Sequence, residues 1–126
     1  LKIGCPKKYA PSKKILNWAK KNKVKLLVTT KPDEAAKDSD CIMTDKWVSM
    51  NDKVNKKQKK KILKPYQVNK KLMSKAKSDA IFMHCLPVGR GEEVTDEIID
   101  GKQSVVWRQA LNRVHAQKSI IKWCLD

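Results

Sequence analysis

Several features are absent from the 126-residue sequence, and each absence excludes a class of protein. No apolar run approaches the roughly 18 residues that a membrane-spanning helix needs. The four cysteines form no Cys-x-x-Cys pair and no histidine stands at zinc-finger spacing, which argues against structural zinc and a disulfide framework. The four glycines form neither Gly-x-Gly-x-x-Gly nor a P-loop, so a nucleotide cofactor is unsupported. We expect a soluble, cytoplasmic protein with reduced thiols.

Acidic residues are scarce, with 13 Asp and Glu against 29 Lys and Arg, which gives a formal net charge of +16. A positive charge of this size favours binding to polyanions such as nucleic acids, because neutralised phosphates release their counterions. The densest basic run, 53–61, contains no aromatic residue and no arginine, so base stacking and base-edge recognition have little to work with. We interpret this run as a solvated helix face, and a non-catalytic nucleic-acid-binding domain remains an alternative.

Short apolar segments alternate with longer segments of helical period, which is typical of α/β proteins with a parallel sheet. Expected strands cover 1–5, 25–29, 41–44, 80–84 and 104–107. Expected helices cover 12–22, 32–36, the lysine-rich part of 47–63, 69–77, 92–99 (closed by Gly101) and 109–125. The pattern predicts one domain with an open, mainly parallel, Rossmann-like sheet, flanked by helices and closed by a long C-terminal helix.

Ligands of open α/β sheets bind beyond the carboxyl ends of the strands, so the residues that follow each strand are the candidates for a site. Three groups qualify: Asp45 with Trp47, Ser49 and Met50; Cys85 with Leu86 and Pro87; and Gln109 with Asn112 and Arg113.

Each candidate also has a structural interpretation. Asp45 is as well suited to capping the next helix as to binding a ligand. Cys85 is compatible with a small buried hydrophobe and Arg113 with one more exposed cation. His84 lies within strand period and is expected to be a core imidazole, while His115 is expected on a helix surface or at a packing contact.

The sequence contains three motifs: Asp45-Lys46-Trp47-Val48-Ser49-Met50, Phe82-Met83-His84-Cys85-Leu86-Pro87 and Gln109-Ala110-Leu111-Asn112-Arg113-Val114-His115-Ala116-Gln117-Lys118. These motifs occur in the same order as in ornithine carbamoyltransferases, and the sequence resembles that family. The resemblance assigns 1–126 to the second, ornithine-binding domain, with 109–125 as its C-terminal helix. The carbamoyl phosphate-binding domain of the family, with its Ser-x-Arg-Thr-Arg loop, is absent from these residues. Leu1 lies within an expected strand, so we expect a fragment.

The resemblance implies a reaction and its partners. The family transfers the carbamoyl group of carbamoyl phosphate to the side-chain amine of L-ornithine, which gives citrulline and phosphate. It needs neither a metal nor a cofactor, and the complete enzyme is expected to be a homotrimer of arginine biosynthesis. The isolated fragment is expected to be inactive, because its phosphate site belongs to the other domain.

The resemblance also implies roles for the amino-acid site. Asp45 and Ser49 would hold the α-ammonium of ornithine, and the backbone of Met50 would meet its carboxylate. Cys85 would lie against the side-chain amine and help to keep it unprotonated and aimed.

Two further roles concern the carbamoyl group. The carbonyl of Leu86 would accept a hydrogen bond from the carbamoyl amide, with the Leu86–Pro87 peptide bond expected to be cis. Arg113 would contact an oxygen of carbamoyl phosphate as a fixed cation.

The sequence departs from the family at three positions near these motifs. Asn51 stands where the family usually has glycine, and Arg108 and Leu111 stand where it usually has acids. The loss of two acids beside Arg113 bears on how that arginine is oriented. A transcarbamylase for another amine is an alternative within the family, and the Ser49-Met50 pair favours an α-amino acid.

Overall fold

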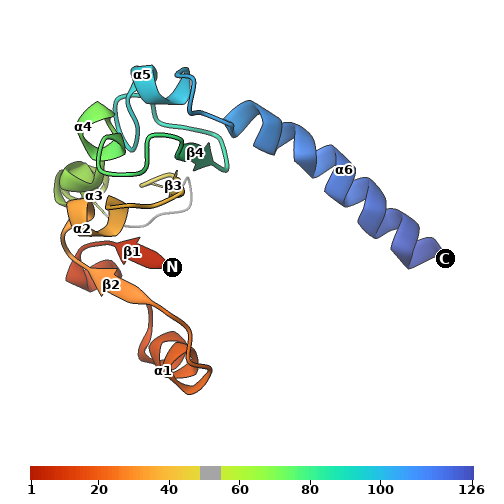
Figure 1. Cartoon of the computed structure of the whole chain (residues 1–126), viewed down its shortest axis with the longest axis horizontal. Helices are drawn as coiled ribbons and strands as arrows, with labels where there is room; N and C mark the ends of the chain where they lie inside the picture. Colours follow the sequence, from red (N-terminus) through yellow and green to blue (C-terminus); the bar gives the residue numbers. More distant parts are fainter. Residues whose placement is uncertain (49–54) are drawn as a thin grey trace.

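A computed structural model describes residues 1–48 and 55–126 (Figure 1). In chain order its elements are β1 (Lys2–Gly4), η1 (Lys7–Tyr9), α1 (Lys13–Lys21), β2 (Leu27–Thr29), α2 (Pro32–Ala36), β3 (Cys41–Thr44), α3 (Lys56–Leu63), η2 (Lys64–Tyr66), α4 (Lys70–Met73), β4 (Ile81–His84), α5 (Asp96–Ile99) and α6 (Val106–Leu125). The α/β class and the long C-terminal helix are confirmed.

The strands pair in parallel, as the alternating pattern predicts. β1 pairs with β2, and β3 pairs with β4 in a register that runs from Cys41 opposite Ile81 to Thr44 opposite His84. The described strands form two sheets of two rather than one open sheet. Residues of β1 and β3 both line a cavity of about 550 Å³.

Short polar side chains start several of the helices. Ser12 caps α1, Asn55 caps α3 and Asn69 caps α4, each accepting a hydrogen bond from a backbone N–H in the first turn. Such caps satisfy donors that a helix leaves without an internal partner. The lysine-rich helix α3 has no buried residue, which confirms the solvated face expected for that part of the basic run. Residues 53 and 54 of the run lie outside the described residues.

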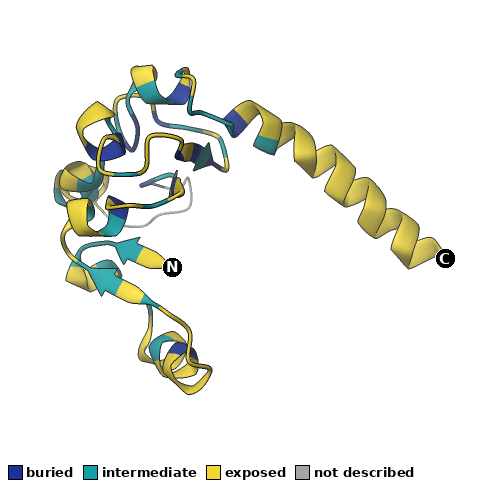
Figure 2. Ribbon diagram, viewed as in Figure 1, coloured by how far each residue is buried: buried dark blue, intermediate teal, exposed yellow. Residues whose placement is uncertain are grey.

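The hydrophobic core lies around β3 and β4 (Figure 2). Phe82 at its centre is completely buried, as are Val94, Ile99 and Val106. These side chains come from β4, the segment before α5, α5 itself and the first residue of α6. Beyond Val106, α6 extends away from the sheets and is largely exposed, so it does not close the sheet as expected (Figures 1 and 2).

The prediction of a strand at 104–107 is wrong. Ser104 forms only an isolated parallel bridge with Phe82, and the chain then turns into α6 at Val106, three residues earlier than the predicted start at 109. The bridge is held by two hydrogen bonds, in which the Phe82 N–H donates to the Gln103 carbonyl and the Val105 N–H donates to the Phe82 carbonyl. The Gln109 N–H already donates to the Val105 carbonyl, so helical bonding takes over at once.

Two predicted helices are shorter than expected. Within 69–77 only α4 is helical, because the backbone beyond it pairs with another segment: the Lys75 carbonyl accepts from the Asp38 N–H. Within 92–99 only α5 is helical, because the residues before it pair with Val68, whose N–H donates to the Glu93 carbonyl. Gly101 follows α5 and donates its N–H to the Ile98 carbonyl, which confirms it as the closing glycine.

Candidate functional site

Two of the predicted site residues meet at the carboxyl edge of β3 and β4. The parallel register sets Thr44 opposite His84, so the next residues on the two strands, Asp45 and Cys85, emerge side by side. The Cys85 thiol donates a hydrogen bond to Asp45 Oδ1 across 2.9 Å. A carboxylate and a thiol 40 positions apart in the chain thus form one small polar surface.

The structure decides between the alternatives for these two residues. Asp45 does not cap α3, because Asn55 does so with its own side chain. Asp45 Oδ1 instead accepts from Cys85 and, at 2.6 Å, from the Lys46 N–H. Cys85 is exposed rather than a buried hydrophobe. Both side chains are therefore available to a ligand.

The hydrogen bond between them reinforces the charge state that each group has near neutral pH. It lowers the pKa of Asp45, with the Lys46 N–H acting in the same direction. It raises the pKa of the Cys85 thiol, and partial burial raises that pKa further. A thiol poised for nucleophilic attack needs a lowered pKa, so Cys85 has the wrong electrostatics for covalent catalysis. The pair presents an anion beside a neutral thiol, which suits the binding of an ammonium group or an amine.

Leu86 follows Cys85 in an unusual backbone conformation. Its φ is +53°, and the Leu86–Pro87 peptide bond is cis, as expected. The Leu86 N–H donates to His84 Nδ1 across 2.9 Å, and the Leu86 side chain packs against the core. His84 is buried, as predicted for a core imidazole.

Gln109 joins α6 to this edge, a contact that the sequence analysis missed. Its Oε1 accepts a hydrogen bond from the His84 N–H at 3.1 Å. Gln109 was singled out as a residue that follows a strand, but no local pattern indicates that an amide in a helix will pair with the backbone of a strand 25 positions away.

Arg113 lies four residues beyond Gln109, on the same helix face and about 6 Å further along the axis. It is exposed, and within 1–48 and 55–126 it makes no hydrogen bond or ion pair. The structure therefore does not bring Arg113 into contact with Asp45 or Cys85. His115 is likewise exposed on α6, which agrees with the expected helix surface.

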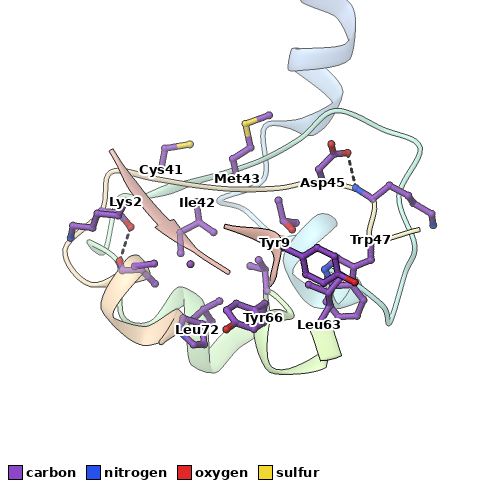
Figure 3. A pocket seen from close by; sticks show the side chains of 18 of the residues that line it. Lys2, Tyr9, Cys41, Ile42, Met43, Asp45, Trp47, Leu63, Tyr66 and Leu72 are labelled. Atoms are coloured by element: carbon purple, nitrogen blue, oxygen red, sulfur yellow. Dashed lines mark hydrogen bonds between the residues drawn. The ribbon is translucent and has the colours of Figure 1, made fainter. Parts of the chain in front are cut away.

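The large cavity borders the same strand end, because Asp45 and Lys46 are among the residues that line it. Figure 3 shows the Asp45 side chain at the end of β3, with Trp47 and Tyr66 among the other lining residues. Cys85 is not among the residues that line this cavity. Asp45 thus lies at the border between the cavity and the polar edge that it forms with Cys85. The predicted site residues Ser49 and Met50 lie outside the described residues, and so does Asn51, which stands where the family usually has glycine.

Comparison with known proteins decides the family. The family model of the aspartate/ornithine carbamoyltransferase, Asp/Orn binding domain, matches residues 1–124. The chain belongs to this family. The ornithine carbamoyltransferase of Bradyrhizobium diazoefficiens is 53% identical over 126 residues, which are 100% of this chain and 41% of that protein.

Solved carbamoyltransferases share the fold as well. The ornithine carbamoyltransferase from Pyrococcus furiosus superposes with a TM-score of 0.84 at 44% identity, over 95% of this chain and 40% of that one. The anabolic ornithine carbamoyltransferase from Campylobacter jejuni gives a TM-score of 0.89 at 36% identity, over 98% of this chain and 42% of that one. The chain thus spans about two fifths of the length of the relatives it matches.

The described part of this carbamoyltransferase domain holds no group of three His, Cys, Asp or Glu side chains placed to bind a metal ion. None of its described helices is both long and apolar enough to cross a membrane.

A second residue that sequence reasoning missed is Glu93, which is completely buried beside His84. Glutamate is rarely buried and no local pattern marks this one, so only the tertiary structure reveals it.

Proposed function

We propose that the chain is the amino-acid-binding part of an ornithine carbamoyltransferase, which transfers a carbamoyl group from carbamoyl phosphate to the side-chain amine of L-ornithine. One observation carries the proposal: the Asp45 carboxylate and the neutral Cys85 thiol share a hydrogen bond at the exposed edge of two parallel strands. The family match and the names of the relatives support it, and they favour an enzyme over a nucleic-acid-binding domain.

The reaction needs a neutral amine aimed at a carbonyl carbon. The amine nitrogen bonds to the carbamoyl carbon, the bond from that carbon to the phosphate oxygen breaks, and the proton released by nitrogen passes to phosphate. Asp45, whose lowered pKa keeps it ionised, pairs with the α-ammonium of ornithine. Cys85, whose raised pKa keeps it neutral, contacts the side-chain amine without stabilising its protonated form. Holding the reactants in this way supplies much of the catalysis.

The remaining roles complete the site. The Leu86 carbonyl accepts from the carbamoyl amide, and Ser49 and Met50 hold the α-ammonium and the carboxylate of ornithine. Arg113 contacts a carbamoyl phosphate oxygen once a carbamoyl phosphate-binding domain, supplied by the rest of the enzyme, faces the polar edge. The complete enzyme is proposed to be a cytoplasmic homotrimer of arginine biosynthesis that needs no cofactor.

The test is calorimetric titration of norvaline, which keeps the α-amino acid head of ornithine but lacks the reacting amine. The enzyme joins this chain to a carbamoyl phosphate-binding domain and is saturated with carbamoyl phosphate. Asp45→Asn keeps the shape of the side chain and removes its charge. Charge-assisted hydrogen bonds contribute about 1.5–3 kcal/mol, so norvaline affinity should fall about 10- to 150-fold.

Asp40→Asn is the matched control. Asp40 is an exposed acid just before β3, paired with Lys77 rather than with Cys85. This variant should leave norvaline affinity unchanged. If Asp45→Asn also leaves it unchanged, Asp45 does not bind the amino acid and the proposal fails.

A further inference from the structure

A buried acid and a buried imidazole lie directly behind the exposed Asp45–Cys85 pair. Glu93 and His84 are 0% and 1% exposed, and His84 Nε2 lies 3.4 Å from Glu93 Oε1. Within the described residues, His84 Nε2 and Glu93 Oε2 have no hydrogen-bond partner. Buried polar groups are costly when they are not fully satisfied, so their presence in a core calls for a reason beyond packing.

The two side chains hold the two ends of one short segment, 86–89. His84 Nδ1 accepts from the Leu86 N–H at 2.9 Å. Glu93 Oε1 accepts from the Gly89 N–H. Because Nδ1 accepts, the proton of a neutral imidazole sits on Nε2, which faces Glu93. The pair therefore fixes the tautomer of His84 as well as the segment.

The segment that they hold is strained. Leu86 has a φ of +53°, a region that residues with a side chain rarely occupy. Such a conformation persists only where the surroundings over-determine it, and such residues cluster at active sites. Among the described contacts, the Leu86 N–H donates a hydrogen bond only to His84 Nδ1, so this contact is the restraint on the Leu86 backbone.

Glu93 also lies close to the loop that carries Asp45. Lys46 Nζ lies 3.9 Å from Glu93 Oε1, and the Lys46 side chain is 34% exposed. Lys46 directly follows Asp45, to whose Oδ1 its own N–H donates. Glu93 thus lies between the two loops that carry Asp45 and Cys85, and Lys46 provides a cation that offsets its buried charge.

We propose that His84 and Glu93 are positioning residues that hold Leu86 in its left-handed conformation and thereby set the direction of the Leu86 carbonyl. The consequence for carbamoyl transfer rests on the proposed function, whereas the positioning itself is a property of this chain. His84 and Glu93 do not touch the reacting atoms. They act through the backbone of residues 86–89.

Nuclear magnetic resonance of the 126-residue chain tests the positioning without any activity. A hydrogen bond from Leu86 N–H to His84 Nδ1 joins two nitrogens, so a nitrogen–nitrogen coupling between them should be measurable in the unmodified protein. The ring nitrogens should show a protonated Nε2 and an unprotonated Nδ1. The opposite tautomer, or absence of the coupling with both signals resolved, overturns the proposal.

Two matched variants separate positioning from mere packing. Asparagine places an acceptor near the position of Nδ1, so His84→Asn should keep the strong intraresidue amide-to-Hα NOE that marks a positive φ at Leu86. His84→Leu fills space but accepts no hydrogen bond, so this NOE should weaken. If His84→Leu keeps it as strong as the parent does, His84 is only packing. If His84→Leu does not fold, His84→Asn and the coupling in the parent still decide.

Kinetics test the consequence in the enzyme that joins this chain to a carbamoyl phosphate-binding domain. His84→Leu should lower kcat about tenfold or more relative to His84→Asn, because small displacements of an aligning group cost large factors in rate. Norvaline affinity should change little, since Asp45 and Cys85 remain. Equal kcat values for the two variants overturn the catalytic consequence. Failure of norvaline to respond to Asp45→Asn overturns the proposed function and leaves the positioning result standing.

Discussion

At the carboxyl edge of β3 and β4, polar groups form hydrogen bonds within the chain, whereas α6 leaves most of its apolar side chains exposed. Asp45 pairs with Cys85, and His84 with the Leu86 N–H. The exposed apolar residues of α6 are Trp107, Leu111, Val114, Ile120, Ile121, Trp123 and Leu125. The arrangement of Asp45 and Cys85 therefore depends on two neighbouring strands, β3 and β4. In the described structure, α6 packs against the rest of the domain only through its first residues.

The largest expected effect concerns activity, because under the proposed function this chain supplies only the amino-acid site. We predict that the purified 126-residue chain forms no citrulline from ornithine and carbamoyl phosphate. Within 1–48 and 55–126 Arg113 makes no contact with Asp45 or Cys85, and proximity of the two substrates supplies much of the catalysis. A colorimetric citrulline assay, with an intact ornithine carbamoyltransferase as the positive control, checks this. Citrulline above background would show that the edge suffices.

The next effect contrasts the core beneath the edge with the end of α6. Phe82→Ala should lower the free energy of unfolding by about 3–5 kcal/mol, because the ring is completely buried in the hydrophobic core. Trp123→Ala is the matched aromatic truncation on α6, where the side chain is 80% exposed, and it should cost less than about 0.5 kcal/mol. Urea unfolding measures both. Similar losses would mean that α6 is packed in solution.

Sequence reasoning predicted the edge because its signals are local. The strand at 41–44 is predicted at its true ends, and the meeting of Asp45 with Cys85 follows once two parallel strands end in register. The predicted position of β4 is also correct to within one residue, since five uncharged residues precede the turn. For β3 and β4, period and composition were sufficient to predict the element and its end.

The sequence analysis did not predict what depends on distant partners. Glu93 was assigned to a helix, yet it lies in a segment whose backbone pairs with Val68 and whose carboxylate lies beside His84. Ser104 was assigned to a strand, yet it makes one bridge to Phe82 before α6 begins. In both cases the backbone is satisfied by a segment far away in the chain, and helix period in the local sequence carries no trace of that pairing.

A third prediction uses the same residue type in the two regions. In the enzyme joined to a carbamoyl phosphate-binding domain, Cys85→Ala should raise the ornithine KM and lower kcat, with kcat/KM falling about tenfold, or about 1.4 kcal/mol. Cys124→Ala, at an exposed position near the end of α6, should leave both constants unchanged. If Cys85→Ala keeps both constants within about twofold, about 0.4 kcal/mol, the thiol only fills space.

The smallest expected effect is a change in the pKa of the Cys85 thiol when Asp45 is replaced. Asp45 raises the pKa of this thiol, first by accepting its hydrogen bond and also by its negative charge. A raised folded-state pKa means that the thiol stabilises the fold below its unfolded pKa, and that this contribution is lost as pH rises through the folded value. Asp45→Asn removes the charge but keeps the shape, so the pKa of Cys85 should fall.

Only the thiolate reacts with iodoacetamide, so at a fixed pH below the parent pKa Cys85 should be alkylated faster in Asp45→Asn than in the parent. Peptide-resolved mass spectrometry over a range of pH follows Cys85 and Cys124 in the same sample. The rate at Cys124 should be the same in both proteins, because that thiol lies near the far end of α6. An unchanged pH profile at Cys85 would mean that its hydrogen bond to Asp45 does not persist in solution, and the edge would then present two independent groups rather than one anion paired with a neutral thiol.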